Sequence, residues 1–257
     1  MIFSYSALNA YDSCPYKFKL QSIDKIETEI PEAMQEGTEF HKFAENYFIE
    51  LYMKNKSPKD DILKIMKYCN IPITKEKIIN HWKNSLKNIE NEYEKDFYVF
   101  EGIRLNKIMK NENVQHYMPM FLEHRFVNKI EGYSFKGFID RIDFSKDIIR
   151  IIDYKGTKPK SLTRLRKQLN IYYLLFKQEY PEYNDMKFYI GSYFYKTGEY
   201  WEEEISKRSL NSTKKWVQKT CELILNDNTY QKKISPYTCG NTPKYSCQFK
   251  SICRGGK

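Results

Sequence analysis

The sequence lacks any run of about 20 apolar residues, the length that a helix needs to cross a bilayer. Its first residues, Met-Ile-Phe-Ser-Tyr-Ser, lack the basic start and following apolar stretch that mark a secretory signal. Internal repeats and low-complexity tracts are absent as well. We therefore expect no membrane partner and a cytoplasmic location.

Disulfides are rare in a reducing compartment, so we expect the six cysteines to be metal ligands or free thiols. Three of them, Cys239, Cys247 and Cys253, lie in a Gly- and Pro-containing loop within the last 19 of the 257 residues. This clustering at a polar terminus favours a metal site over scattered buried thiols. The spacing does not separate zinc from an iron–sulfur cluster, because both accept four thiolates. The candidates for a fourth ligand are Cys14, Cys69 and Cys221.

Acidic residues are missing from residues 155–177, although the whole chain has 33 Asp and Glu beside 43 Lys and Arg. The net charge of +10 is by itself compatible with a protein that binds nothing acidic. A concentrated positive surface, however, favours a polyanionic partner such as nucleic acid. The basic residues of this segment are Lys155, Lys158, Lys160, Arg164, Arg166, Lys167 and Lys177.

Aromatic residues make up 16% of the chain, and this content argues against disorder. Apolar periodicity predicts helices over 7–23 with a break near Pro15, and over 31–54, 60–68, 74–111, 161–180 and 209–225. Runs of β-branched and aromatic residues predict strands over 120–130, 133–144, 148–154, 186–195 and 199–205. This order predicts an α/β (α+β) fold. We divide the chain into a helical region, 1–115, a core, 116–230, and a cysteine-rich tail, 231–257.

Two acids and a lysine meet if residues 137–155 form a β-hairpin. Asp140 would lie on the first strand and Asp153 at the end of the second, and Lys155 would share the strand face of Asp153. Isolated Asp-x-Lys triplets are mostly solvated surface. Here the triplet ends an apolar strand, and two carboxylates suit Mg²⁺ or Mn²⁺. A lysine beside them suits metal-assisted hydrolysis of a phosphodiester.

Asp143 competes with Asp140 for this role. Three residues separate them, so they face opposite sides of one strand, and at most one points at the metal. We choose Asp140, because Gly137 before it permits the close approach of a ligand or of another part of the backbone. Arg141 then points away and is expected to form a structural ion pair.

Gln168 and Tyr172 lie four residues apart on the predicted basic helix and hence on one face. Gln168 is a candidate to contact a phosphate or the attacking water. Tyr172 is a candidate to stack on a base or to brace the lysine, with core packing as its alternative role.

His41 has two interpretations, a hydrogen-bonded structural residue and a metal ligand, and the spacing alone favours the first. Glu123, on the strand before Asp140, has the same two interpretations, and we take it as an ordinary strand-edge acid.

Several short motifs together resemble the RecB-like branch of the PD-(D/E)XK nuclease superfamily. The resemblance is narrower to its iron–sulfur members: CRISPR-associated RecB-like exonucleases, the AddB nuclease domain and related phage enzymes. One departure is the spacing of Cys239 and Cys247, whose counterparts in the family lie close together. The loop between them must bulge outward, or Cys239 is not a ligand. The matching segments are 4–15, 37–41, 137–143, 152–155, 168–172 and 247–253.

The resemblance implies a restriction-endonuclease-like mixed β-sheet core in a prokaryotic or phage protein. It implies that His41, Asp140, Asp153 and the backbone carbonyl of Tyr154 hold Mg²⁺ or Mn²⁺. It also implies that Lys155 serves the attacking water. The cysteines implied to hold a [4Fe–4S] cluster, with Zn²⁺ as the alternative, are Cys14, Cys239, Cys247 and Cys253.

The sequence therefore predicts a metal-dependent deoxyribonuclease, and the resemblance implies an exonuclease on single-stranded DNA or DNA ends. Contacts to DNA are expected from Lys158, Lys160, Arg164, Arg166 and Lys167. Ring-forming relatives leave a homo-oligomer or a protein partner open. The competing hypotheses are a non-catalytic subunit of a recombination or CRISPR spacer-acquisition complex, and a zinc-stapled nucleic-acid-binding protein.

Overall fold

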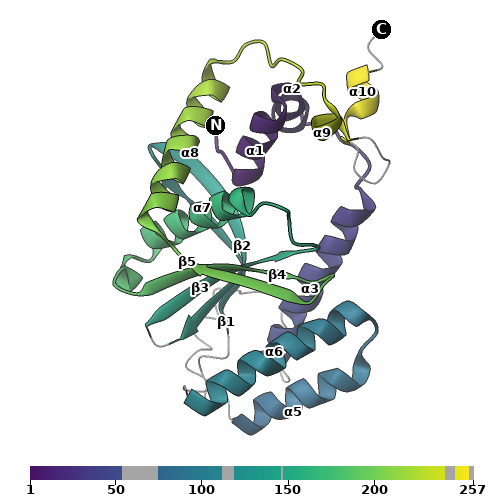
Figure 1. Ribbon diagram of the computed structural model, residues 1–257, viewed down its shortest axis with the longest axis vertical. Helices are drawn as coiled ribbons and strands as arrows, with labels where there is room; N and C mark the ends of the chain where they lie inside the picture. The colour runs from purple at the N-terminus through teal and green to yellow at the C-terminus, as the bar shows by residue number, and fades with distance from the viewer. Residues whose placement is uncertain (54–74, 112–118, 146, 241–246, 255–257) are drawn as a thin grey trace.

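A five-stranded mixed sheet forms the centre of the protein (Figure 1). The computed structural model describes residues 1–53, 75–111, 119–145, 147–240 and 247–254. The strand order is β1-β2-β3-β4-β5, with β3 and β4 parallel and every other neighbouring pair antiparallel. The strands are β1 Pro119–Ile130, β2 Tyr133–Ser145, β3 Ile148–Lys155, β4 Lys187–Phe194 and β5 Glu199–Glu204.

Helices cover both faces of this sheet, which confirms the predicted fold class. Among the described residues, no helix has the length and apolar character needed to cross a membrane. The helices are α1 Tyr5–Ser13, α2 Pro15–Phe18, the π-helix η1 Lys19–Ile23, α3 Glu32–Met53, α5 Lys75–Ser85, the 3-10 helix η2 Leu86–Asn88, α6 Glu92–Asn111, α7 Thr163–Glu179, the 3-10 helix η4 Pro181–Tyr183, α8 Lys207–Asn226, α9 Pro236–Cys239 and α10 Lys250–Arg254.

Local sequence explains how the strands are joined. Glu131 and Gly132 have φ angles of 49° and 84°, the positive values that a tight hairpin turn between β1 and β2 requires. The parallel strands β3 and β4 cannot be joined by a hairpin, and α7 provides the crossover between them. The predicted strands therefore agree with the structure to within one or two residues.

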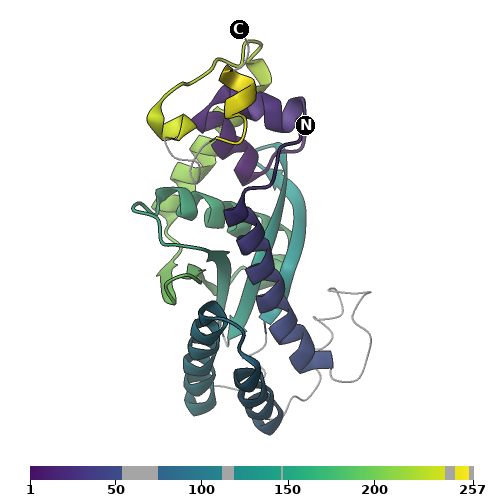
Figure 2. The same ribbon diagram turned by 90° about the vertical axis from the view of Figure 1, so that its right-hand side faces the viewer.

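Two hydrophobic clusters lie on opposite faces of the sheet. One cluster joins the sheet to α1, α7 and α8, with buried residues such as Leu169 and Val217. The other joins it to α3, α5 and α6, with Phe40 and Phe97 at its centre. Figure 2 shows α3 running along the sheet from the cysteine-bearing end towards the α5–α6 pair. The side chains of α3 therefore pack in the second cluster and also reach the edge of the sheet.

The N-terminal helical region differs in detail from the prediction. The break expected near Pro15 is present, because Cys14 is extended with φ −161° between α1 and α2. Of the helix predicted over 74–111, residues 75–111 form α5, η2 and α6, with a bend between η2 and α6. The helix predicted over 60–68 lies outside the described residues. The tail, expected as a loop, also contains the short helices α9 and α10.

Candidate metal centre and active site

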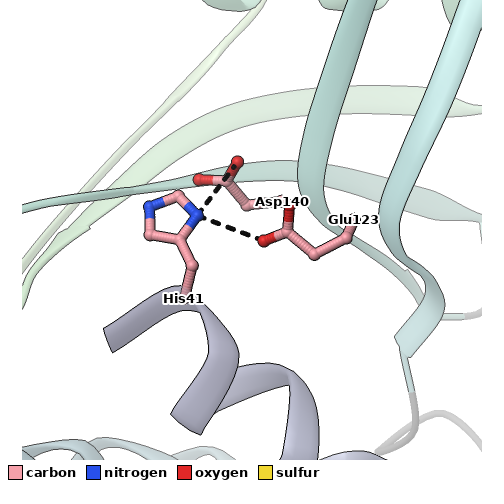
Figure 3. Close-up of side chains that lie close together, drawn as sticks. All are labelled: His41, Glu123 and Asp140. Atoms are coloured by element: carbon pink, nitrogen blue, oxygen red, sulfur yellow. Dashed lines mark hydrogen bonds and ion pairs between the residues drawn. The ribbon is translucent and has the colours of Figure 1, made fainter. Parts of the chain in front are cut away.

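Three side chains from separate elements converge beside the sheet: His41 of α3, Glu123 of β1 and Asp140 of β2 (Figure 3). One ligand atom from each lies within 4.8 Å of the other two. His41 Nδ1 is 3.1 Å from Glu123 Oε1 and 3.6 Å from Asp140 Oδ1. Among the described residues, these three form the only group of His, Cys, Asp or Glu side chains that is compact enough to hold a metal ion.

Strand register brings the acids together. Leu122 pairs with Arg141 and His124 with Ile139, so Glu123 lies directly across from Asp140. Glu123 has a φ of 44°, a left-handed conformation that costs about 1–3 kcal/mol for a residue other than glycine. Strain of this kind collects at functional sites, and here it occurs at a residue of the cluster. The interpretation of Glu123 as an ordinary strand-edge acid is therefore not supported by the geometry.

Asp153 and Lys155 extend the cluster on β3. Arg141 pairs with Ile152, which places Asp140 beside Asp153 on the neighbouring strand. The Lys155 ammonium lies 2.8 Å from Asp153 Oδ2. Asp153 Oδ2 is buried, and its contact is this ion pair and not a hydrogen bond. The predicted proximity of Asp140, Asp153 and Lys155 is therefore found.

Backbone groups of Tyr154 tie the site together. The Tyr154 amide donates to Asp140 Oδ2 at 2.6 Å. Its carbonyl lies 3.3 Å from His41 Nε2. The Tyr154 phenol ring packs in the second hydrophobic cluster, the one formed with α3, α5 and α6, where it is fully buried. The Tyr154 carbonyl, which is expected to be a metal ligand, therefore lies beside the His41 imidazole.

A short chain of hydrogen bonds from α7 fixes Asp153. Gln168 Nε2 donates to Asp153 Oδ1 at 2.9 Å and lies 2.8 Å from the Tyr172 hydroxyl. Tyr172 packs against Gly137, where an added Cβ would lie 3.1 Å from the ring. Gln168 and Tyr172 thus share one helix face, as predicted, and they orient an acid of the site.

The charges of the site are unbalanced without a cation. Burial and then the charge of Asp153 raise the pKa of Asp140 to about 7, against the opposing effect of His41 and Lys155. Burial would lower the pKa of His41, but its hydrogen bond to Glu123 and the charges of Asp140, Glu123 and Asp153 outweigh burial and raise it to about 9. Burial also opposes the charged form of Lys155, yet Asp153 and Asp140 raise its pKa. Asp140 and His41 therefore favour their protonated forms, and a bound metal ion would displace those protons.

The donor set fits a hard divalent cation. Carboxylate and carbonyl oxygens are the ligands that Mg²⁺ and Mn²⁺ prefer, and an imidazole is compatible with Mn²⁺. The buried Asp153 Oδ2, which faces Lys155 but accepts no hydrogen bond, and the raised pKa of Asp140 are the features that such an ion would satisfy. The residues able to hold it are His41, Glu123, Asp140, Asp153 and the carbonyl of Tyr154.

Asp143 and Arg141 lie away from this centre. Arg141 Nε donates to Asp143 Oδ1 at 2.7 Å, and its Nη1 lies 2.5 Å from Glu101 Oε1. Both acids and the arginine are buried. The expected structural ion pair of Arg141 is therefore present, and it ties β2 to α6.

The basic residues expected to contact DNA have different surroundings. Arg166 forms two hydrogen bonds of 2.7 Å with the Glu203 carboxylate, so much of its charge is engaged. Lys167 lies 4.3 Å from the centre of the Trp216 ring. Lys158 is 3.5 Å from Glu199 and is exposed. Lys160 and Arg164 are exposed beyond the end of β3, where a phosphate can reach them.

Four cysteines line one pocket at the end of the molecule that holds α1, α2, α9 and α10: Cys14, Cys239, Cys247 and Cys253. Cys247 N donates to Cys239 O at 2.9 Å, so the chain returns on itself across the intervening segment. The long spacing between these two cysteines therefore does not separate their backbones. Cys221 is buried in α8, away from the pocket, and Cys69 lies outside the described residues.

The chain matches one protein family by sequence and resembles a solved structure in its fold. Residues 2–254 match the family model of the PD-(D/E)XK nuclease superfamily. A solved structure from Eubacterium rectale, named "putative exonuclease", has a TM-score of 0.50 at 13% identity and covers 100% of this chain and 88% of its own. A second, SSO0001, is 16% identical over 82% of this chain and 96% of its own, and its TM-score of 0.32 does not show a shared fold. No curated protein sequence matches the chain.

Proposed function

The chain belongs to the PD-(D/E)XK nuclease superfamily, and from this premise we propose that it is a divalent-metal-dependent DNA nuclease. The observation that carries the proposal is the convergence of His41, Glu123 and Asp140 within 4.8 Å, beside the Asp153–Lys155 pair. Exonuclease action on single strands or DNA ends is the finer part of the proposal. It is supported by the motifs of the RecB-like branch and by the name of the E. rectale structure.

Each residue has a role that follows from its position. Bound at these acids, Mg²⁺ or Mn²⁺ would activate water and offset the charge of the scissile phosphate. Lys155, held against Asp153, places an ammonium where negative charge grows on the phosphate during hydrolysis. Gln168 fixes the orientation of Asp153. The exposed Lys160 and Arg164 would guide the DNA backbone to this edge of the sheet.

Digestion of end-labelled linear DNA beside closed circular DNA tests this function. We expect the purified protein to degrade the linear form with Mg²⁺ or Mn²⁺ and to spare the closed circle, because an exonuclease requires an end. EDTA should stop the reaction, since the acids alone do not activate water. Cleavage of the circle would show an endonuclease. Binding without cleavage in either metal would instead favour the non-catalytic subunit.

We further propose that the four-cysteine pocket holds a [4Fe–4S] cluster, as in the iron–sulfur members of the RecB-like branch. Zn²⁺ is the alternative occupant, because it also accepts four thiolates. A cluster here would join Cys14 to Cys239, Cys247 and Cys253 and so tie the two ends of the chain together.

Replacing Cys14 should therefore remove the colour of the cluster and lower the stability of the protein. A link that closes a loop of this length removes entropy from the unfolded chain, and its loss should cost about 3 kcal/mol or more. We expect Cys14→Ser, purified without oxygen, to lose the brown colour with absorption near about 400 nm that thiolate-to-iron charge transfer gives. Its melting temperature should also fall.

Cys221→Ser is the matched control, because Cys221 is also buried but lies outside the pocket. It should keep the colour, whatever its effect on stability. A colourless wild-type protein that contains stoichiometric zinc, or a Cys14→Ser protein with unchanged iron content and melting temperature, would refute the cluster.

A further inference from the structure

The β1–β2 hairpin continues past the end of β3 and carries an exposed apolar and basic strip. β3 pairs with Arg141–Ser145 of β2, and the same register places its last residue, Lys155, level with Phe138, so residues 133–137 of β2 extend beyond it. We define the hairpin strip by the side chains that alternate with buried ones at this end of the hairpin. Its residues are Arg125, Val127 and Lys129 of β1 and Lys136 and Phe138 of β2.

The two faces of the hairpin differ sharply. On one face Phe126, Phe135 and Gly137 are buried, and Gly137 lies against Tyr172 and Leu175 of α7. On the other face Phe138 is 53% exposed and Val127 48% exposed. Arg125 is the cross-strand partner of Phe138, and Lys136 is the partner of Val127. Each apolar side chain therefore has a cation directly beside it.

The strip is positive and lacks acids. Residues 124–130 and 133–139 contain no Asp or Glu. Among the described residues, Arg125, Lys129 and Lys136 form no ion pair. Their charges are therefore available to a negatively charged partner.

The hairpin strip lies next to the candidate metal centre on the same two strands, β1 and β2. Phe138 precedes Asp140 by two residues and Arg125 follows Glu123 by two, which is about 6.6 Å along a strand. One nucleotide of an extended, unstacked strand spans a comparable distance. A strand whose phosphate lies at the acids would therefore bring the next base to Phe138.

We propose that the hairpin strip binds single-stranded DNA, with one base stacked on Phe138 and the phosphates neutralised by Arg125 and Lys136. Aromatic rings spaced among cations are the general means of binding an unpaired strand. A duplex fits less well, because its bases are already stacked and leave Phe138 without a face to contact. This inference rests on the proposed nuclease function. It selects single-stranded DNA as the substrate and names Phe138 as the residue that contacts a base.

Binding in the Asp153→Asn background, which suppresses hydrolysis, tests the strip. We expect Phe138→Ala to weaken binding of a labelled single-stranded oligonucleotide by about 5- to 150-fold. Phe138→Trp should restore affinity and Phe138→Leu should not, because stacking requires a ring and not only an apolar side chain. Ile103→Ala, which removes a similarly exposed side chain (56%) on α6, is the control and should bind normally.

The same variants on two other probes isolate the stacked base. The Phe138→Ala penalty should vanish on an oligonucleotide of abasic sites and on a blunt duplex, neither of which offers an unpaired base. Lys136→Ala should lower the slope of log affinity against log salt concentration by about 0.7. A penalty of equal size on all three probes, or none on the single strand, would overturn the proposal. Should Phe138→Ala not fold, Phe138→Leu against Phe138→Trp decides in the same way.

The outcomes also separate this inference from the proposed function. If the wild-type protein hydrolyses no DNA in Mg²⁺ or Mn²⁺, the nuclease proposal fails, whatever Phe138 does. If it hydrolyses DNA and Phe138→Ala still binds and cleaves single strands as the wild type does, only the strip fails.

Discussion

Asp153→Asn and Lys155→Met are each expected to slow phosphodiester hydrolysis by at least about 10²–10³-fold while DNA binding changes little. Asp153 is 1% exposed, lies beside Asp140 across the β2–β3 pair, and is held by Gln168. Its amide variant keeps the shape but removes the charge that a divalent cation requires. Lys155→Met removes the ammonium that would face the phosphate as its charge grows. DNA binding depends mainly on other cations, so it should survive both changes.

Single-turnover rates on end-labelled DNA, with binding measured separately by fluorescence anisotropy, check this expectation. Asp185→Asn and Lys187→Met are matched controls, because both residues are exposed and precede or begin β4, away from the candidate metal centre. They should retain the wild-type rate. If both site variants still cleave DNA at that rate, the acids and the lysine are not the active site.

The sheet was predictable because its signals are local. Alternating and β-branched runs define each strand, and the Glu131–Gly132 pair defines the turn between β1 and β2. Once β2 and β3 form a hairpin, the proximity of Asp140 and Asp153 follows from register alone. The short distance in sequence between these strands is why the acids could be paired without a structure.

Glu123 could not be assigned in the same way. Its approach to His41 depends on the docking of α3, which lies 82 residues away in sequence. It also depends on a positive φ at a glutamate, a conformation that the sequence normally signals with glycine. The engagement of Arg166 by Glu203 on β5 has the same cause, since 37 residues separate the partners. Long-range packing, and not residue type, decided these contacts.

Arg141→Met is expected to lower the free energy of unfolding by about 3–5 kcal/mol, a large part of the total stability of a domain. The Arg141 side chain is fully buried and contacts Asp143 and Glu101, whose carboxylates are buried too. Its guanidinium also lies 4.6 Å from the centre of the Phe48 ring. Removing the cation leaves two buried acids with less compensating charge. Arg104 still pairs with both acids, but their desolvation is then offset by one cation instead of two.

Urea denaturation of matched variants measures this cost. Arg150→Met is the control, because Arg150 pairs with Glu202 at 3.0 Å but is 29% exposed, and exposed pairs contribute at most about 1 kcal/mol. The double variant Arg141→Met/Asp143→Asn should cost less than the sum of its single variants, because the second change removes an acid that the first left with Arg104 as its remaining ion-pair partner. Equal losses for Arg141→Met and Arg150→Met would contradict the argument.

The position of Arg141 links this stability to the site. It directly follows Asp140 on β2, and its partner Glu101 lies on α6, which packs with α3 in the second hydrophobic cluster. Loss of the ion pair should therefore loosen the packing that holds His41 opposite Asp140. We expect Arg141→Met to bind the divalent metal more weakly than Arg150→Met at a temperature where both remain folded. Isothermal titration with Mn²⁺ would show this difference.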